Sequence, residues 1–367
     1  MAFVAAYSWA ATGYAPQELY TLTVPTSGVR SIVGRGPVPM ARYPFVPNPM
    51  RPQATTAPSE AAPQEPEAEE RDVKTLMVVR LTAFTLLCNA AQRWIIELLS
   101  IAHLPYVLLG MCLLPPCLGF WKSEYTVSYG YGTATALSAL AIYTSAAHFG
   151  CAPLALAHCI LIILYGVRLN LYLLYRETCI PKFRLFRERI EERATQRGPR
   201  LARAPFVVSC GFLYMGLVAP LMLSASWASL SAGHPMTIIF QALIGLAYLG
   251  FAIASFGDLQ KSYAKSKNPG LVTGGIYSWL RHPNYTGEQL MWTASFLAGA
   301  LAYFSAQAFT LAQGAYLLVS LLGCVGINFV LAQATAQLEK RQAEKYGNDD
   351  EYKSWIGSSW AGFGVSQ

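Results

Sequence analysis

Three long stretches of this 367-residue sequence carry no Asp, Glu, Lys or Arg, and they limit the possible folds more than any other feature. They run from 125 to 167, from 204 to 257 and from 289 to 337. Each is long enough for two membrane crossings, because a bilayer core requires about 20 apolar residues per helix. Only 13% of the residues are charged and 54% are apolar, about half the charge of a soluble domain. The sequence therefore predicts an all-α, polytopic transmembrane helical bundle.

Apolar segments indicate about 7–8 spans. The first is the weakest, because Arg80, Arg93 and Glu97 lie within it, and an interfacial amphipathic helix is the alternative there. The expected spans are 76–100, 103–121, 126–148, 152–175, 206–225, 236–257, 289–309 and 311–334.

The N-terminal region has the composition of a segment that does not fold into a packed core. Residues 1–57 combine four Arg with a single Glu and many Pro, Ser and Thr, which fits either an organellar transit segment or a disordered tail. An acidic, Pro-rich linker follows at 58–72. We divide the remainder into an N-terminal transmembrane half, 73–203, and a C-terminal half, 204–367. The membrane is expected to be that of a plastid or another organelle, with the endoplasmic reticulum as the alternative.

Basic residues gather in short loops beside the apolar segments. The loop 176–203 has nine Arg or Lys against four acidic residues, a net charge of +5. The positive-inside rule places this loop on the cytoplasmic or stromal side, and counting spans places 258–288 and the tail after Ala334 there too. Topology thus explains the net charge of +7, and nucleic-acid binding is not expected. Within the loop, Arg184 to Arg193 resembles a solvated amphipathic helix.

The eight cysteines form no CxxC pair, and neither a disulfide framework nor a metal site is predicted. Trp355, Trp360 and Phe363 have the character of interfacial anchors. Arg168, near the end of a charge-free stretch, is expected to face the bundle or to extend toward its cytoplasmic end.

The loop 258–288 is the segment most suited to chemistry, since it is polar, rich in Gly and aromatic residues, and set between two apolar spans. Pro283 suits the first position of a helix, whose free backbone N–H groups would face the loop. Together with Arg281 and Lys261, this helix start can bind a phosphate or a carboxylate. Glu288 lies at the membrane entrance, where a carboxylate is costly, so it is a functional candidate. The alternative is that Arg281 simply pairs with Glu288.

Four sequence strings resemble the steroid 5α-reductase C-terminal-domain superfamily, in a poorly characterised branch of it. They are RHPNYTGE (281–288) after GIYSWL, the preceding DLQK (258–261), the later LEKRQAEKYGNDDEYKSW (338–355), and a fainter YGVRLNLYLLYRE (165–177). The wider superfamily includes sterol reductases and, more distantly, isoprenylcysteine carboxyl methyltransferases. The resemblance extends mainly over 258–355.

This resemblance implies an NADPH-dependent reductase acting on a double bond of a lipophilic steroid, sterol or isoprenoid-like substrate in the bilayer. Arg281 and Lys261 would neutralise phosphates, and Asp258 and Asn284 would hold amide or ribose groups. The proton donor is expected to be Tyr285 or Glu97, although pairing of Glu97 with Arg93 is the alternative. The implied cofactor residues are Asp258, Lys261, Tyr277, Arg281, His282, Asn284, Tyr285, Glu288, Glu339 and Tyr352.

Two other functions stay open. The Arg-His-Pro-x-Tyr-x-Gly string also resembles the methyltransferase branch, where it binds S-adenosylmethionine. Asn284, Glu288 and the DLQK string favour the reductase. A non-catalytic membrane scaffold is the third hypothesis, and charges retained at membrane depth argue against it. The sequence indicates neither the substrate itself nor the oligomeric state.

Overall fold

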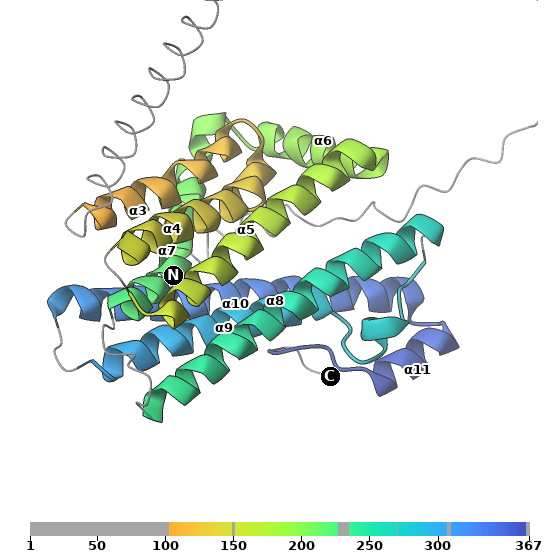
Figure 1. Cartoon of the computed structure of the whole chain (residues 1–367). Coiled ribbons are helices and arrows are strands. Elements are labelled where there is room, and N and C mark those ends of the chain that lie inside the picture. The colour runs from red at the N-terminus through yellow and green to blue at the C-terminus, as the bar shows by residue number, and fades with distance from the viewer. Residues whose placement is uncertain (1–102, 149–150, 227–234, 269, 307–309, 365–367) are drawn as a thin grey trace, which may run out of the picture. The chain divides into compact units, whose positions relative to one another are not determined.

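The computed structural model describes residues 103–148, 151–226, 235–268, 270–306 and 310–364, all within one compact unit. These residues form α-helices and short 3-10 helices, and among them there is no β-strand beyond an isolated bridge (Figure 1). The all-α prediction is confirmed. The transit or disordered segment 1–57, the linker 58–72 and the expected span 76–100 lie outside the described residues.

Proline residues mark where many helices begin, as their fixed φ and missing N–H suit the first helical turn. They occupy this position in α3, α5, α6 and α9. The α-helices are α3 (Leu104–Leu113), α4 (Tyr129–His148), α5 (Pro153–Cys179), α6 (Pro181–Gln196), α7 (Ala204–Ser226), α8 (Pro235–Lys267), α9 (Pro283–Phe304), α10 (Leu311–Tyr346) and α11 (Asp350–Ser358). The 3-10 helices are η1 (Pro115–Phe120), η2 (Ser123–Thr126), η3 (Arg200–Arg203) and η4 (Gly275–Ser278).

Four of the described helices are long and apolar enough to cross a membrane: α5, α7 (extended by η3), α8 and α10. They correspond to the expected spans 152–175, 206–225, 236–257 and 311–334. Helices α4 and α9 have 20 and 22 residues, which is a spanning length, but they are less apolar.

In the structure the expected span 103–121 consists of α3, which has 10 residues, followed by η1. Together they form one apolar helical segment, Leu104–Phe120, which is shorter than the four helices above. Two successive prolines, Pro115 and Pro116, then turn the chain into η1. Proline cannot donate the backbone hydrogen bond that would continue the α-helix.

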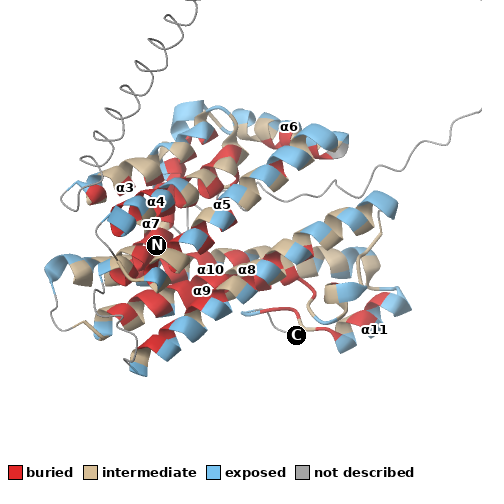
Figure 2. Cartoon of the chain, viewed as in Figure 1, coloured by how far each residue is buried: buried red, intermediate tan, exposed pale blue. Residues whose placement is uncertain are grey.

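Helices α8 and α9 pack closely because glycines face each other. A Cβ on Gly287 would lie 2.5 Å from the backbone of Gly250 and Ala254, and a Cβ on Gly250 would lie 2.6 Å from that of Gly287. Small residues at such crossings let helix backbones approach in membranes, where no hydrophobic driving force joins helices. Buried residues are concentrated on α7 and α9, which lie inside the bundle (Figure 2).

Contacts between side chains fix the relative directions of the helices. Helices α5 and α8 run parallel, because Tyr248 donates to the carbonyl of Ala157 and, further along both helices, Arg168 pairs with Asp258. Helix α9 runs back along α8, and α10 runs back along α9. The loop 176–203, the loop 258–288 and the end of α10 therefore lie at the same end of the bundle, here called the polar end.

Candidate active site

The turn between α8 and α9 is held by one glutamine of α8. The Gln260 side chain donates to the carbonyl of Gly274 (2.7 Å) and accepts from the N–H of Ile276 (3.1 Å). Gly275 adopts a φ of +64°, a conformation that glycine enters without strain. The buried Tyr277 hydroxyl then donates to the carbonyl of Gly257 (3.0 Å). Burial raises the pKa of Tyr277, so the hydroxyl keeps its proton and acts as a donor.

The C-terminal segment covers this turn. The indole N–H of Trp355 on α11 donates to the carbonyl of Tyr277 (2.7 Å), and Trp355 is buried. The prediction of Trp355 as an interfacial anchor is therefore wrong, because the ring packs inside the protein. Beyond α11, Trp360 pairs with the turn through two backbone hydrogen bonds, from Arg281 N–H to its carbonyl (2.9 Å) and from its N–H to Trp279 (2.8 Å). Tyr352, also on α11, is buried beside Trp355.

A carboxylate on α10 binds both residues that precede α9. Arg281 donates to Glu339 at 2.6 Å, and the His282 imidazole contacts the other oxygen of the same carboxylate at 2.6 Å. Burial lowers the pKa of His282, whereas the Glu339 carboxylate raises it. Because burial is the larger effect, a neutral ring that donates its Nε2–H to Glu339 is favoured. The alternative pairing of Arg281 with Glu288 is wrong, because Glu339 is the partner. Tyr285 stacks on the His282 ring, with centroids 6.3 Å apart.

Helices α5 and α8 meet at a second ion pair. Arg168 donates to the Asp258 carboxylate (2.8 Å) and to the carbonyl of Ser255 (3.2 Å), as expected for an arginine facing the bundle. One turn later, the Tyr172 hydroxyl contacts Ser262 (2.6 Å) and donates to the Asp258 carbonyl (3.2 Å). Asp258 is therefore neutralised by a residue of the N-terminal half, which the resemblance over 258–355 could not indicate.

Deeper in the bundle, polar groups from three helices meet around Glu288. The Tyr165 hydroxyl of α5 interacts with the Glu288 carboxylate and with the hydroxyl of Tyr131 on α4. The Tyr131 hydroxyl in turn interacts with the indole N–H of Trp292 on α9. The Tyr165 and Trp292 rings meet edge to face at 5.3 Å, and Tyr131 stacks on Tyr214 at 5.0 Å.

The three donor groups of this cluster are buried and face one another. Tyr131, Tyr165 and Trp292 are 8%, 0% and 2% exposed. Within the described residues, neither hydroxyl nor the indole N–H has a hydrogen-bond partner. Side-chain interactions nonetheless link Tyr131 to both Tyr165 and Trp292, and Tyr165 to Glu288, so these groups face one another within the cluster. Glu288 beside them is partly buried.

The structure therefore gathers most of the predicted site. The turn, the start of α9, the end of α10 and α11 together carry Tyr277, Arg281, His282, Asn284, Tyr285, Glu288, Glu339 and Tyr352. Asp258 and Lys261 lie on the last turns of α8, and Lys261 interacts electrostatically with His282. Glu97, the other candidate proton donor, lies outside the described residues. Sequence reasoning missed Tyr131, Tyr165 and Trp292, because uncharged aromatic residues in apolar spans look like ordinary core.

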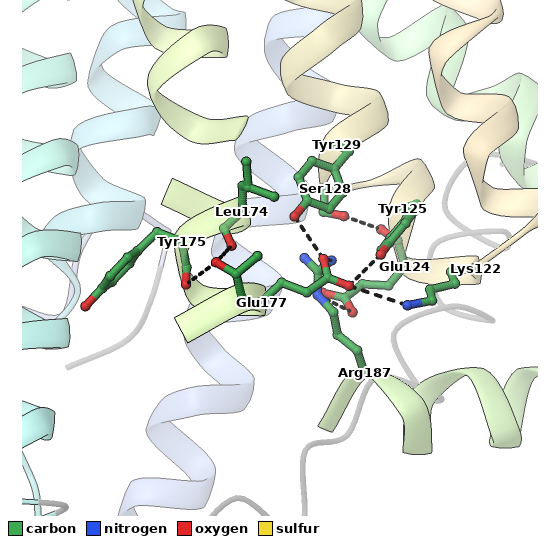
Figure 3. A network of polar contacts seen from close by, with 10 residues as sticks. Lys122, Glu124, Tyr125, Ser128, Tyr129, Leu174, Tyr175, Glu177 and Arg187 are labelled. Carbon is green, nitrogen blue, oxygen red and sulfur yellow. Dashed lines mark hydrogen bonds and ion pairs between the residues drawn. The ribbon is translucent and has the colours of Figure 1, made fainter. Parts of the chain in front are cut away.

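A second polar network, also missed, lies near the polar end of α5 (Figure 3). Glu177 accepts hydrogen bonds from Tyr125 (2.5 Å), Tyr129 (2.8 Å) and Arg187 of α6 (2.6 Å). Arg187 also contacts Glu124 at 3.3 Å and is only 2% exposed.

This network shows that α6 is not wholly solvated. Helix α6 is amphipathic as predicted, but Phe183, Arg187 and Ile190 point into the protein. The spacing of these residues, four and then three apart, was the available signal for a buried helical face.

Comparison with known proteins gives a family without an assigned activity. A family model described as "Protein of unknown function (DUF1295)" matches residues 121–358, which include both polar clusters. "Uncharacterized protein C594.04c" of Schizosaccharomyces pombe is 34% identical over 88 residues, covering 24% of this chain and 23% of that protein. No solved structure matches the chain.

Proposed function

Because this chain belongs to the DUF1295 family, whose description states no activity, we propose its function from its site: an NADPH-dependent reduction of a carbon–carbon double bond in a lipophilic, membrane-dissolved substrate. The observation that carries this proposal is the order in which charged and phenolic side chains are arranged along the start of α9. Cationic residues precede the helix, and an acidic and phenolic cluster lies one to three turns inside it.

The resemblance of 258–355 to the steroid 5α-reductase C-terminal-domain superfamily supports the same reaction class. The RHPNYTGE string supplies the residues of this helix start, and LEKRQAEKYGNDDEYKSW supplies Glu339 and Tyr352. The resemblance does not extend to Tyr131, which therefore supports the proposal independently.

The residues present fit a dinucleotide. Among buried side-chain atoms, Arg281 Nε, Asn284 Oδ1 and Arg168 Nη1 have no hydrogen-bond partner within the described residues. The first turn of α9 has no side-chain cap, which leaves its backbone N–H groups for an anion. We assign Arg281, Lys261 and these N–H groups to the phosphates, and Asn284 to an amide or hydroxyl group.

When bound, NADPH supplies a hydride, one proton with two electrons, which together with one further proton saturates a double bond and leaves NADP⁺. The chain must provide that further proton. Tyr165 and Glu288 are suited to this, because the phenol interacts directly with the carboxylate inside a largely apolar bundle. Tyr285 is less suited, since its ring stacks on His282 at the turn.

Methyl transfer from S-adenosylmethionine is the alternative function. Transfer of a methyl group to a carboxylate requires no proton donor, whereas reduction of a double bond does. The buried phenols beside Glu288 therefore favour the reductase.

Cofactor titration of the purified, detergent-solubilised protein tests this proposal. We expect saturable NADPH binding that is at least ~tenfold weaker in Arg281→Ala and in Asn284→Ala, because each removes a charged or amide contact. Lys353→Gln, on the exposed face of α11, is the matched control and should bind as the wild type does. Binding of S-adenosylmethionine alone would reverse the assignment, and binding of neither cofactor would favour the scaffold.

A further inference from the structure

Gln241 is a polar side chain on the exposed, lipid-facing side of α8. The other large side chains on this side, such as Ile238 and Leu249, are apolar and exposed, whereas Phe240 on the opposite side is fully buried. No charged residue occurs from 204 to 257, so Gln241 lies in the part of α8 that is apolar enough to cross a membrane. Gln241 therefore places an amide among side chains that face hydrocarbon.

The chemistry of this amide indicates what it can bind. Within the described residues, the Gln241 side chain forms no hydrogen bond. Hydrocarbon offers neither a donor nor an acceptor, so a polar group at this depth is stabilised by a hydrogen bond to another protein helix. A primary amide carries two N–H donors and an acceptor oxygen, and it is therefore complementary to a second copy of itself.

The surface beside Gln241 allows another helix to come close. Gly245 follows one turn later on the same side, and no atom lies within 4 Å of the position of its Cβ. Ala242 is exposed next to it. Small residues at such positions let two helix backbones approach in a membrane, where packing and hydrogen bonds between helices drive association.

Helix α8 also has the most surface to offer. Only 22% of its apolar stretch is buried within the chain, against 67% in α7, and exposed residues follow α8 along its length (Figure 2). The residues of α8 that contact α9, such as Gly250, lie on the other side of the helix, since 100° separates successive residues. A second helix can therefore pack on α8 without covering the start of α9.

We propose that two copies of this chain associate through α8, with the two Gln241 amides bonded to each other beside Gly245. Both copies have the same orientation in the membrane, so a twofold axis perpendicular to the bilayer places each residue at the same depth as its counterpart. Each Gln241 amide then donates one hydrogen bond and accepts one. This dimer goes beyond the proposed function and does not depend on it, because each copy keeps its own site.

Cysteine cross-linking of the full chain in liposomes tests the geometry, in a variant whose eight native cysteines are replaced. Gly245→Cys should form a disulfide between two copies on oxidation, because a disulfide requires Cα atoms within about 7 Å of each other. Adding Gln241→Leu should lower the cross-linked fraction at least ~fivefold. Leu318→Cys on α10 is the matched control, because it is also exposed and apolar, and it should not cross-link.

Counting copies by single-molecule photobleaching in liposomes gives a second measurement. We expect the wild type to dimerise as the protein-to-lipid ratio rises, and Gln241→Leu and Gly245→Leu to dimerise at least ~tenfold more weakly. Both substitutions place a good helix former at an exposed position, so circular dichroism should show unchanged helix content. Gln333→Leu, at the last residues of the expected span 311–334, replaces another exposed glutamine and should dimerise as the wild type does.

The outcomes separate this proposal from the proposed function. A wild type that stays monomeric at every protein-to-lipid ratio would overturn the dimer, and so would a dimer that Gln241→Leu does not weaken. Equal cross-linking of Gly245→Cys and Leu318→Cys would show random encounters and would overturn the α8 interface. NADPH binding is measured separately, and its absence would leave the dimer standing.

Discussion

Arg187 is the residue whose charge the fold depends on most clearly. Its side chain is almost completely buried and contacts Glu177 and Glu124. The guanidinium carbon lies 5.1 Å from the ring centroids of both Tyr125 and Tyr129. Arg187→Ala would remove the cation that contacts both carboxylates and leave Glu177 with only the Lys122 ammonium, 3.4 Å away. We expect a loss of ~3–5 kcal/mol in the free energy of unfolding, the usual cost of removing one partner of a buried pair. Denaturant unfolding in detergent measures this.

Arg184 is the control for this prediction, because it is exposed on the same helix. Arg184→Ala should change the free energy of unfolding by less than about 0.5 kcal/mol. Equal effects of the two variants would contradict the burial of Arg187.

The loss of unfolding free energy in Arg187→Ala should also depend on pH. Burial raises the pKa of Glu124 and Arg187 opposes this, so removal of Arg187 raises it further. An acid with a raised pKa in the fold favours folding at low pH, so the defect should shrink as the pH falls toward 5.

At the level of elements, the crossing of α8 and α9 positions the start of α9 against Asp258. Gly287 lies at this crossing and directly precedes Glu288. In Gly287→Ala the new Cβ would meet backbone atoms of α8 at 2.5 Å, and backbone cannot rotate away as a side chain can. We expect a destabilisation of ~1–3 kcal/mol, typical of overpacking, measured as a lower thermal unfolding midpoint.

Gly245 provides the matched control on α8. No atom lies within 4 Å of the position of its Cβ, so Gly245→Ala should be neutral or should stabilise the helix by up to ~1 kcal/mol. A similar loss in both variants would show that helix propensity, and not close approach, determines the effect.

The elements also show what a sequence can and cannot specify. Helices α5, α7, α8 and α10 were predictable, because each has enough consecutive apolar residues to span a bilayer. The start of α9 was predictable from Pro283. The end of α3 at Leu113 was not, because Pro115 and Pro116 had been counted inside an apolar run without their effect on the helix.

The partners of the site residues were less predictable. The sequence pattern places Arg281 just before α9 and Glu339 in the last part of α10, but it contains no information on which distant carboxylate an arginine meets. Asp258 pairs with Arg168, 90 positions away, through a contact that depends on the parallel packing of α5 and α8. Tyr165 and Trp292 carry no charge and sit in apolar segments, so only the fold identifies them as a polar cluster.

At the scale of the whole described bundle, charged side chains gather at the polar end. The stretches 204–257 and 289–337 contain no ionisable acid or base of the Asp, Glu, Lys and Arg types. Since α9 and α10 each reverse the direction of the helix before, the charged loops return to the polar end every second crossing. Charged residues at one end of an apolar bundle favour a single orientation in the membrane.

Labelling from either side of the membrane tests this orientation, using single cysteines in a variant whose eight native cysteines are replaced. Thr195→Cys and Ser354→Cys lie at exposed positions of the polar end, and Leu311→Cys lies 93% exposed at the opposite end. A membrane-impermeant maleimide should label the first two from the cytoplasmic or stromal side and the third from the other side only, because α10 separates Leu311 from the tail. Detergent-opened vesicles, in which all three should react, control for accessibility. Labelling of Leu311→Cys and Ser354→Cys from the same side would mean that α10 does not cross, and the site at the start of α9 would then lose its membrane setting.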